Sequence, residues 1–199
     1  MATTETRRTR VRQTRQESRE RIVAAATELV RTRSYAELSV DLVMSEAGLG
    51  RTIFYRHFDD LADLLLRVGR EAIDELYAAQ RSLTAASPAD IRGAMEAAVG
   101  VYARHGPLLR AVAEAAAGDR EIAADYEQMR TRFDDFAEQS LRGMTSTGGT
   151  APADLAQTAR ALNLLNENYL LDAFGREARV SQETAVQTLT EIWESVVHR

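Results

Sequence analysis

The chain has 199 residues, 45% of them hydrophobic, which is enough for one sizeable core or for a small domain beside a larger one. Cysteine is absent, which excludes disulfides and thiolate metal sites. No apolar run is long enough to span a membrane, and no apolar segment follows the charged N-terminus. We therefore expect a cytoplasmic protein without a signal peptide.

The charge is unevenly distributed along the chain. Its net value of −5 by itself argues against a nucleic-acid-binding protein. However, residues 1–58 hold eleven Arg against seven Asp or Glu, a balance of +4, and residues 59–199 hold fourteen Arg against twenty-three acids, a balance of −9. Lys is absent, so every basic side chain is a planar guanidinium. A basic N-terminal part on an acidic body indicates a polyanionic partner at one end.

Apolar residues at alternating spacings of three and four predict an all-α chain with no β-strand. The first 17 residues carry several Arg without apolar periodicity, so they are predicted to be a disordered basic arm. A helix-turn-helix head is expected over 18–64 and a larger body over 65–199. Nine helices are predicted, three in the head and six in the body, at about 18–33, 40–47, 51–58, 59–82, 87–105, 108–117, 119–144, 152–174 and 181–199.

Caps and breakers set several of these boundaries. Ser39 and Ser181 are good N-caps, since their hydroxyls can accept from free helical N–H groups. Gly48 ends the helix before it, because only glycine enters the left-handed region without steric cost. The run His105-Gly106-Pro107 is predicted to break a helix, and the run from Ser146 to Pro152 is predicted to be a flexible loop.

The stretch from Val40 to Phe58 predicts two short helices joined by a tight turn. Val43, Met44 and Ala47 lie on one face of the first helix, and Phe54 and Phe58 are core candidates in the second. Two such helices around a glycine-containing turn make a helix-turn-helix, whose second helix would present its polar side chains to a duplex groove.

These residues also resemble a known family. The run Ala-Gly-Leu-Gly-Arg-Thr-Ile-Phe-Tyr-Arg-His-Phe at 47–58 is similar to the signature of TetR-type transcriptional regulators. It departs from that signature at Gly50, where Ser is usual, at Ile53, where Thr is common, and at Leu61, where a phosphate-contacting Lys is usual. The nine predicted helices match the TetR-type architecture. In the C-terminal half, Ala161–Glu167 and Ile192-Trp193 resemble mycobacterial regulators of the ethionamide-activation type.

The DNA-binding candidates follow from the charge pattern and the resemblance. Base readout is expected from Arg51, Thr52 and Arg56, because Arg suits guanine and the Thr methyl suits thymine. The resemblance implies backbone contacts for Tyr55 and His57. Tyr55 as a packing residue and Arg56 as a solvated charge are the alternatives. The remaining candidates, all for phosphate contact or capping, are Ser39, Gly50, Arg10, Arg12 and Arg15; for the arm, a solvated tail is the alternative.

The body is expected to hold a small, mostly apolar ligand. Asn166 lies on the apolar stripe of its helix, where an amide needs a partner, so it either orients a ligand or bonds a neighbouring helix. The resemblance favours the ligand pocket for Asn163, Asn166 and Trp193. The predicted pocket residues are Tyr102, Met129, Phe133, Phe136, Asn163, Asn166, Tyr169 and Trp193.

Pseudo-palindromic operators need a two-fold dimer, so a homodimer is expected. The last two helices are the predicted seam, because apolar residues recur there at the spacing of a helical packing face. The same stripe could instead face the chain's own core, and Trp193 fits this seam as well as the pocket. The predicted interface residues are Leu164, Leu171, Val186, Leu189 and Val196.

No catalytic motif, metal-binding spacing or cofactor loop stands out, and the three His residues have no suitable partners in sequence. The sequence therefore predicts no enzyme, no cofactor and no metal site. It predicts a dimeric DNA-binding regulator, and the resemblance implies a repressor released by a small apolar ligand. The alternatives are a constitutive DNA-binding protein without an effector and a helical small-molecule carrier.

Overall fold

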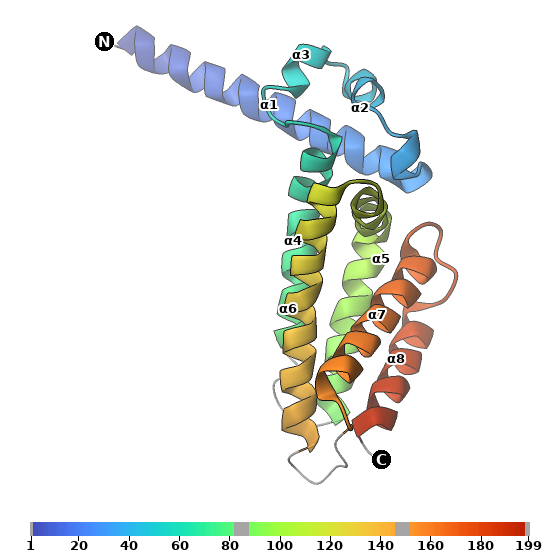
Figure 1. The fold of residues 1–199 in the computed structure, drawn as a ribbon. Helices are drawn as coiled ribbons and strands as arrows, with labels where there is room; N and C mark the ends of the chain where they lie inside the picture. The colour runs from blue at the N-terminus through green and yellow to red at the C-terminus, as the bar shows by residue number, and fades with distance from the viewer. Residues whose placement is uncertain (1, 82–87, 146–151, 198–199) are drawn as a thin grey trace. The chain divides into compact units, whose positions relative to one another are not determined.

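The computed structural model of the chain describes residues 2–81, 88–145 and 152–197, and within them it contains no β-strand. The all-α prediction is confirmed (Figure 1). The described part holds eight α-helices and one 3-10 helix, where the sequence predicts nine helices. They are α1 Ala2–Thr32, η1 Tyr35–Glu37, α2 Val40–Ala47, α3 Arg51–Phe54, α4 Leu61–Arg81, α5 Pro88–Gly118, α6 Arg120–Thr145, α7 Leu155–Phe174 and α8 Gln182–Val197.

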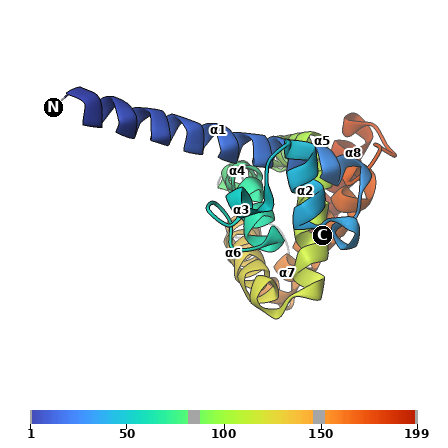
Figure 2. The same ribbon diagram turned by 90° about the horizontal axis from the view of Figure 1, so that it is seen from above.

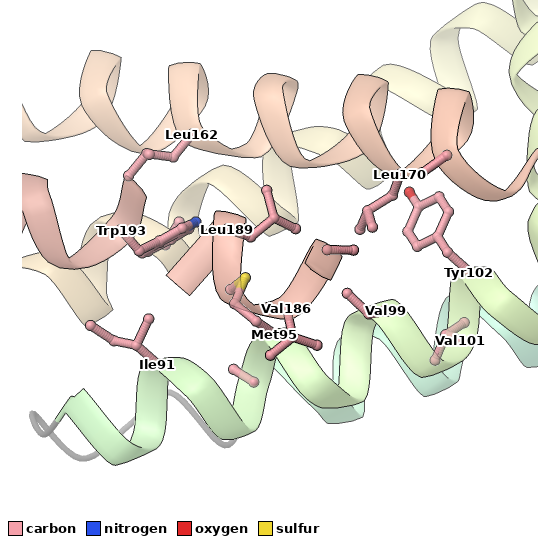
Figure 3. Packing of buried hydrophobic residues seen from close by; sticks show 14 of the residues in the cluster. Ile91, Met95, Val99, Val101, Tyr102, Leu162, Leu170, Val186, Leu189 and Trp193 are labelled. Atoms are coloured by element: carbon pink, nitrogen blue, oxygen red, sulfur yellow. The ribbon is translucent and has the colours of Figure 1, made fainter. Parts of the chain in front are cut away.

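The chain forms two compact units, and the boundary between them lies inside α4, between Val68 and Gly69. The boundary predicted from the sequence comes after residue 64. In the first unit α2 packs on α1 and α3 packs on α2 (Figure 2). The predicted apolar stripe of α1 is buried there, together with Phe54 and Phe58. In the second unit α5 packs against α6, α7 and α8, and α6 packs along α7. Figure 3 shows side chains of α5, α7 and α8 meeting in its core.

The helix α5 continues through His105-Gly106-Pro107, so the predicted break there is wrong. Proline inside a helix removes one backbone hydrogen bond but leaves the rest of the ladder. Gly106 has a packing role instead: a Cβ on it would lie 2.1 Å from the carbonyl oxygen of Phe174. At Gly106 the backbone of α5 therefore contacts the backbone at the end of α7. The two helices predicted at 87–105 and 108–117 form the single helix α5.

The helix α1 begins at Ala2, whereas the sequence predicts a disordered arm before Ser18. Arg, Gln and Glu are good helix formers, and a helix already anchored by packed turns extends without a new nucleation cost. The predicted loops at 82–87 and 146–151 lie outside the described residues. No helix in the described ranges combines the length and the apolar character that crossing a bilayer requires.

Candidate DNA-binding surface and ligand cavity

Local capping builds the turn between α2 and α3. The Ser39 hydroxyl accepts from the backbone N–H of Leu42 at 3.1 Å, and Gly48 ends α2 in the left-handed region with φ 62°. Both predicted boundaries are confirmed. Arg21 of α1 adds a contact that the sequence did not indicate, since its Nη2 donates to the carbonyl of Ala47 at 2.6 Å. A cation at the negative end of a helix stabilises this terminus.

The second helix of the motif presents a polar outer face. Phe54 and Phe58 are buried, with ring centroids 5.6 Å apart. The side chains on the other face are exposed, and Tyr55 is 51% exposed although it is aromatic. Gly50, the N-cap of α3, makes no side-chain cap, and a Cβ there would meet no heavy atom within 4 Å. The helix α3 ends at Phe54, earlier than the predicted end at residue 58. Of the predicted base-reading residues, Arg51 and Thr52 lie exposed on α3, and Arg56 lies exposed in the turn that follows it.

Arg51 is held by two neighbours on the same surface. Its Nη1 donates to both carboxylate oxygens of Asp41, at 2.9 and 3.1 Å, and its Nη2 donates to the Tyr55 hydroxyl at 3.1 Å. The Tyr55 hydroxyl and the Asp41 carboxylate together raise the pKa of Arg51. Sequence reasoning missed Asp41, because partners ten residues apart on two short helices are not a spacing rule. These contacts orient the guanidinium of Arg51 on the surface.

Two predicted DNA contacts, Arg15 and His57, also join α1 to the turn that follows α3. His57 Nε2 lies 2.9 Å from the hydroxyl of Ser18, and Arg15 Nη2 donates to the carbonyl of Arg56 at 3.0 Å. Burial, followed by the charges of nearby arginines including Arg15, lowers the pKa of His57. Arg10 and Arg12 lie outside the residues whose side chains the structure describes.

The second unit contains a partly open cavity of about 110 Å³ between α4, α5, α6, α7 and α8. Its wall is mostly apolar. Six of the eight residues predicted for a ligand pocket line it, namely Tyr102, Met129, Phe133, Asn163, Asn166 and Trp193. Phe136 and Tyr169, also predicted, do not line it.

The structure corrects part of the predicted dimer seam. Leu164 and Leu171, each partly exposed, line the cavity. Val186 and Leu189 are only 4% and 0% exposed within a single chain, so they pack in its own core and offer no surface to a second copy. Val196 is partly buried against the same core. An apolar stripe at helical spacing shows that one face is buried, but not whether the neighbour is the same chain.

Trp193 belongs to the cavity. It is buried in the core (Figure 3), and its indole Nε1 donates to Asn166 Oδ1 at 3.3 Å. An indole N–H can only donate, which fixes the orientation of the Asn166 amide. The Asn166 Nδ2 group is left with Met95 Sδ at 4.0 Å, a weak acceptor.

Charged side chains on the cavity wall are paired with one another. The Tyr126 hydroxyl donates to Glu167, and Arg130 Nε lies 3.2 Å from the same carboxylate. Burial, with the adjacent Glu167 carboxylate, raises the pKa of Tyr126. Asn163 is occupied too, since its Nδ2 donates to Asp134 at 2.9 Å. These pairs are set by three-dimensional proximity, and no spacing in the sequence indicated them.

A basic helix-turn-helix in one unit and a helix-lined cavity in the other define a DNA-binding transcriptional regulator. Two family models agree. "Bacterial regulatory proteins, tetR family" matches residues 22–68, and "Transcriptional regulator EthR, C-terminal domain" matches residues 91–198. The chain belongs to the TetR family, with a C-terminal domain of the EthR type.

Relatives of known role support this assignment. The chain is 29% identical over 179 residues to the HTH-type transcriptional regulator EthR of Mycolicibacterium smegmatis, covering 86% of this chain and 82% of that one. It is 27% identical over 187 residues to EthR of Mycobacterium tuberculosis, covering 89% and 85%. Since these relatives are transcriptional regulators, the prediction that the chain is not an enzyme is confirmed.

Solved structures share the fold. A TetR-family regulator from Rhodococcus RHA1 superimposes with a TM-score of 0.77 at 17% identity, covering 91% of this chain and 97% of that one. The TetR-family regulator PfmR from Thermus thermophilus gives a TM-score of 0.74 at 21% identity, covering 89% and 99%.

Proposed function

We propose that the chain is a homodimeric repressor that binds a pseudo-palindromic DNA operator and is released by a small, largely apolar ligand. Each head would place the exposed face of α3 in a major groove. The ligand would occupy the cavity of the second unit. The observation that carries the ligand part is the Asn166 amide on the wall of a mostly apolar cavity, where the acceptor of its Nδ2 group among the described residues is the thioether of Met95. A ligand carbonyl would satisfy it.

Helix α4 can couple ligand binding to operator binding, because it belongs to both units. Leu61–Val68 belong to the first unit, whereas Ile73, Leu76 and Gln80 of the same helix line the cavity. A ligand that contacts these side chains can favour one placement of α4 over another. Allosteric coupling between two sites typically amounts to about 1–3 kcal/mol, which we expect between ligand and operator here.

For the dimer we propose the exposed face of α7. Leu165 is 39% exposed, and Ala161, Asn168 and Asp172 lie exposed at helical spacing on the same face. An exposed leucine among small and polar residues suits an isologous contact, in which the same face meets its copy. Val196 keeps its predicted place at this interface.

The DNA part is tested by footprinting on the DNA upstream of the chain's own gene. Arg51→Ala is expected to weaken binding to the preferred sequence about tenfold and to relax the preference at one base pair. Arg31→Ala is the matched control: it removes the same charge from an exposed position on α1. Equal sequence preference in wild type and Arg51→Ala would remove Arg51 from the recognition surface.

The ligand part is tested with medium-chain N,N-dimethylamides, which supply a carbonyl acceptor and no donor. They are expected to raise Tm and to release the operator. Asn166→Ala should weaken their binding about two- to tenfold, the value of one neutral hydrogen bond. Thr190→Val is the control, since Thr190 is buried but does not line the cavity. Binding that is indifferent to Asn166 would contradict the assignment, and amides that bind without releasing DNA would favour a regulator without an effector.

A further inference from the structure

Gln80 of α4 is a buried polar side chain on the wall of the cavity. It is 9% exposed, and its Nε2 donates to the carbonyl oxygen of Phe133 at 2.9 Å. Because a carbonyl can only accept, the amide orientation is determined: nitrogen toward Phe133, oxygen away from it. The Gln80 side chain is therefore held by one end, and its Oε1 is directed elsewhere.

No donor among the described residues lies within hydrogen-bond distance of Gln80 Oε1. Buried polar atoms without a partner are uncommon, because losing water without gaining a hydrogen bond is costly. Tyr126 and Arg130, which line the same cavity, contact the Glu167 carboxylate rather than Gln80. Gln80 Oε1 is thus a buried acceptor of a cavity-lining residue, and no group of the described residues satisfies it.

We propose that Gln80 Oε1 is a ligand-binding acceptor and that the effector carries a hydrogen-bond donor, a hydroxyl or an amide N–H, at the end that reaches α4. This inference rests on the proposed function and specifies its ligand class. The effector is then an apolar body with an acceptor for Asn166 at one place and a donor for Gln80 at another. Carboxylates are disfavoured, because an ionised carboxylate has no proton to donate. It would also lie beside Glu167 and Asp134, whose cationic neighbours Arg130 and Arg160 are already paired with them.

The ligand-free protein provides the first test. Gln80→Met replaces the amide with an apolar side chain of similar length, and Phe133 keeps its hydrogen bond inside α6. If Oε1 has no partner in the ligand-free chain, the variant has a Tm about 2–4 °C above wild type. A lower Tm would mean that Oε1 already has a partner, and the inference would fail. Thr190→Val is the reference, because the hydroxyl of Thr190 is the other buried side-chain group without a partner in the described residues.

The second test compares matched probes by calorimetry. N,N-dimethylamides with an ω-hydroxyl are compared with their ω-methoxy analogues over a homologous series of chain lengths. At the best length, wild type and Thr190→Val should bind the hydroxyl probe up to about tenfold more tightly, and Gln80→Met should bind the two equally. The ω-carboxylate analogue should bind more weakly than either.

The outcomes separate this inference from the proposed function. If the unsubstituted amide binds and releases DNA, but the hydroxyl adds nothing at any length, the repressor proposal stands and the role of Gln80 is refuted. A hydroxyl preference that persists in Gln80→Met also refutes it. If neither probe binds, the donor-bearing ligand class is refuted together with the amide site.

Discussion

Gly106→Ala tests whether α5 really runs unbroken against the end of α7. A Cβ at this position would lie 2.1 Å from the carbonyl oxygen of Phe174 and 2.6 Å from its carbonyl carbon. Non-bonded carbon atoms prefer separations of about 3.5–4.0 Å, so the two backbones would have to part by roughly an ångström. Neither partner is a flexible side chain that can turn aside.

Two opposing effects decide the magnitude. Replacing a helical glycine with alanine gains about 1 kcal/mol of helix propensity. Overpacking of this kind costs about 1–3 kcal/mol and occasionally more, and contact with backbone atoms places Gly106 at the upper end. We expect a net loss of about 2 kcal/mol in the free energy of unfolding, which corresponds to a Tm lower by about 4–8 °C.

Gly93 is the matched control in the same helix. It is exposed, and a Cβ there would meet no heavy atom within 4 Å. Gly93→Ala therefore keeps only the propensity gain and should raise Tm by about 2–4 °C. Thermal unfolding followed by circular dichroism measures both variants. If Gly106→Ala were as stable as Gly93→Ala, the close approach of the two backbones would be wrong, and a break at Pro107 would be the better description.

Two further predictions concern the first unit. Gly50→Ser should add the missing side-chain cap to α3 and raise the free energy of unfolding by a few tenths of a kcal/mol. Chemical denaturation would show this as a higher denaturant midpoint. An unchanged midpoint would mean that α3 does not begin after Gly50. Because burial, together with Arg15, Arg19 and Arg56, lowers the pKa of His57 below 6.5, protonation opposes folding, and stability should fall as pH drops below about 6.5 toward the lower pKa of the folded state. His57→Gln should flatten this part of the Tm–pH profile, and identical profiles would refute the assignment.

Local signals in the sequence predicted most of the helices correctly, because caps and amphipathic stripes are local. Ser39 needs only the first turn of its own helix, and Gly48 needs only the turn that follows it. Gly106 is different. The same residue type either ends a helix or admits a close neighbour, and only the position of Phe174, far along the chain, distinguishes the two uses.

The same limit explains the site predictions. Periodicity placed Trp193 and Leu189 on one apolar face, and the sequence left open whether that face meets the cavity, the chain's own core or a second copy. The structure separates them, since Trp193 bonds Asn166 at the cavity and Leu189 is core. An apolar stripe predicts that one face of a helix is buried, because any apolar neighbour can bury it. The stripe does not identify which neighbour does so.

The position of Gln80 in the sequence is enough to predict that its side chain is buried. Ile73, Leu76 and Gln80 recur at spacings of three and four, so Gln80 stands on the apolar stripe of α4 in the same way that Asn166 stands on that of α7. A polar residue on an apolar stripe signals a buried hydrogen-bonding group, and this rule finds both amides without coordinates. The rule does not tell which atom of each amide already has a hydrogen-bond partner, because that depends on the partner. The Trp193 indole must donate, so it occupies the oxygen of Asn166 and leaves the nitrogen for a ligand. The Phe133 carbonyl must accept, so it occupies the nitrogen of Gln80 and leaves the oxygen.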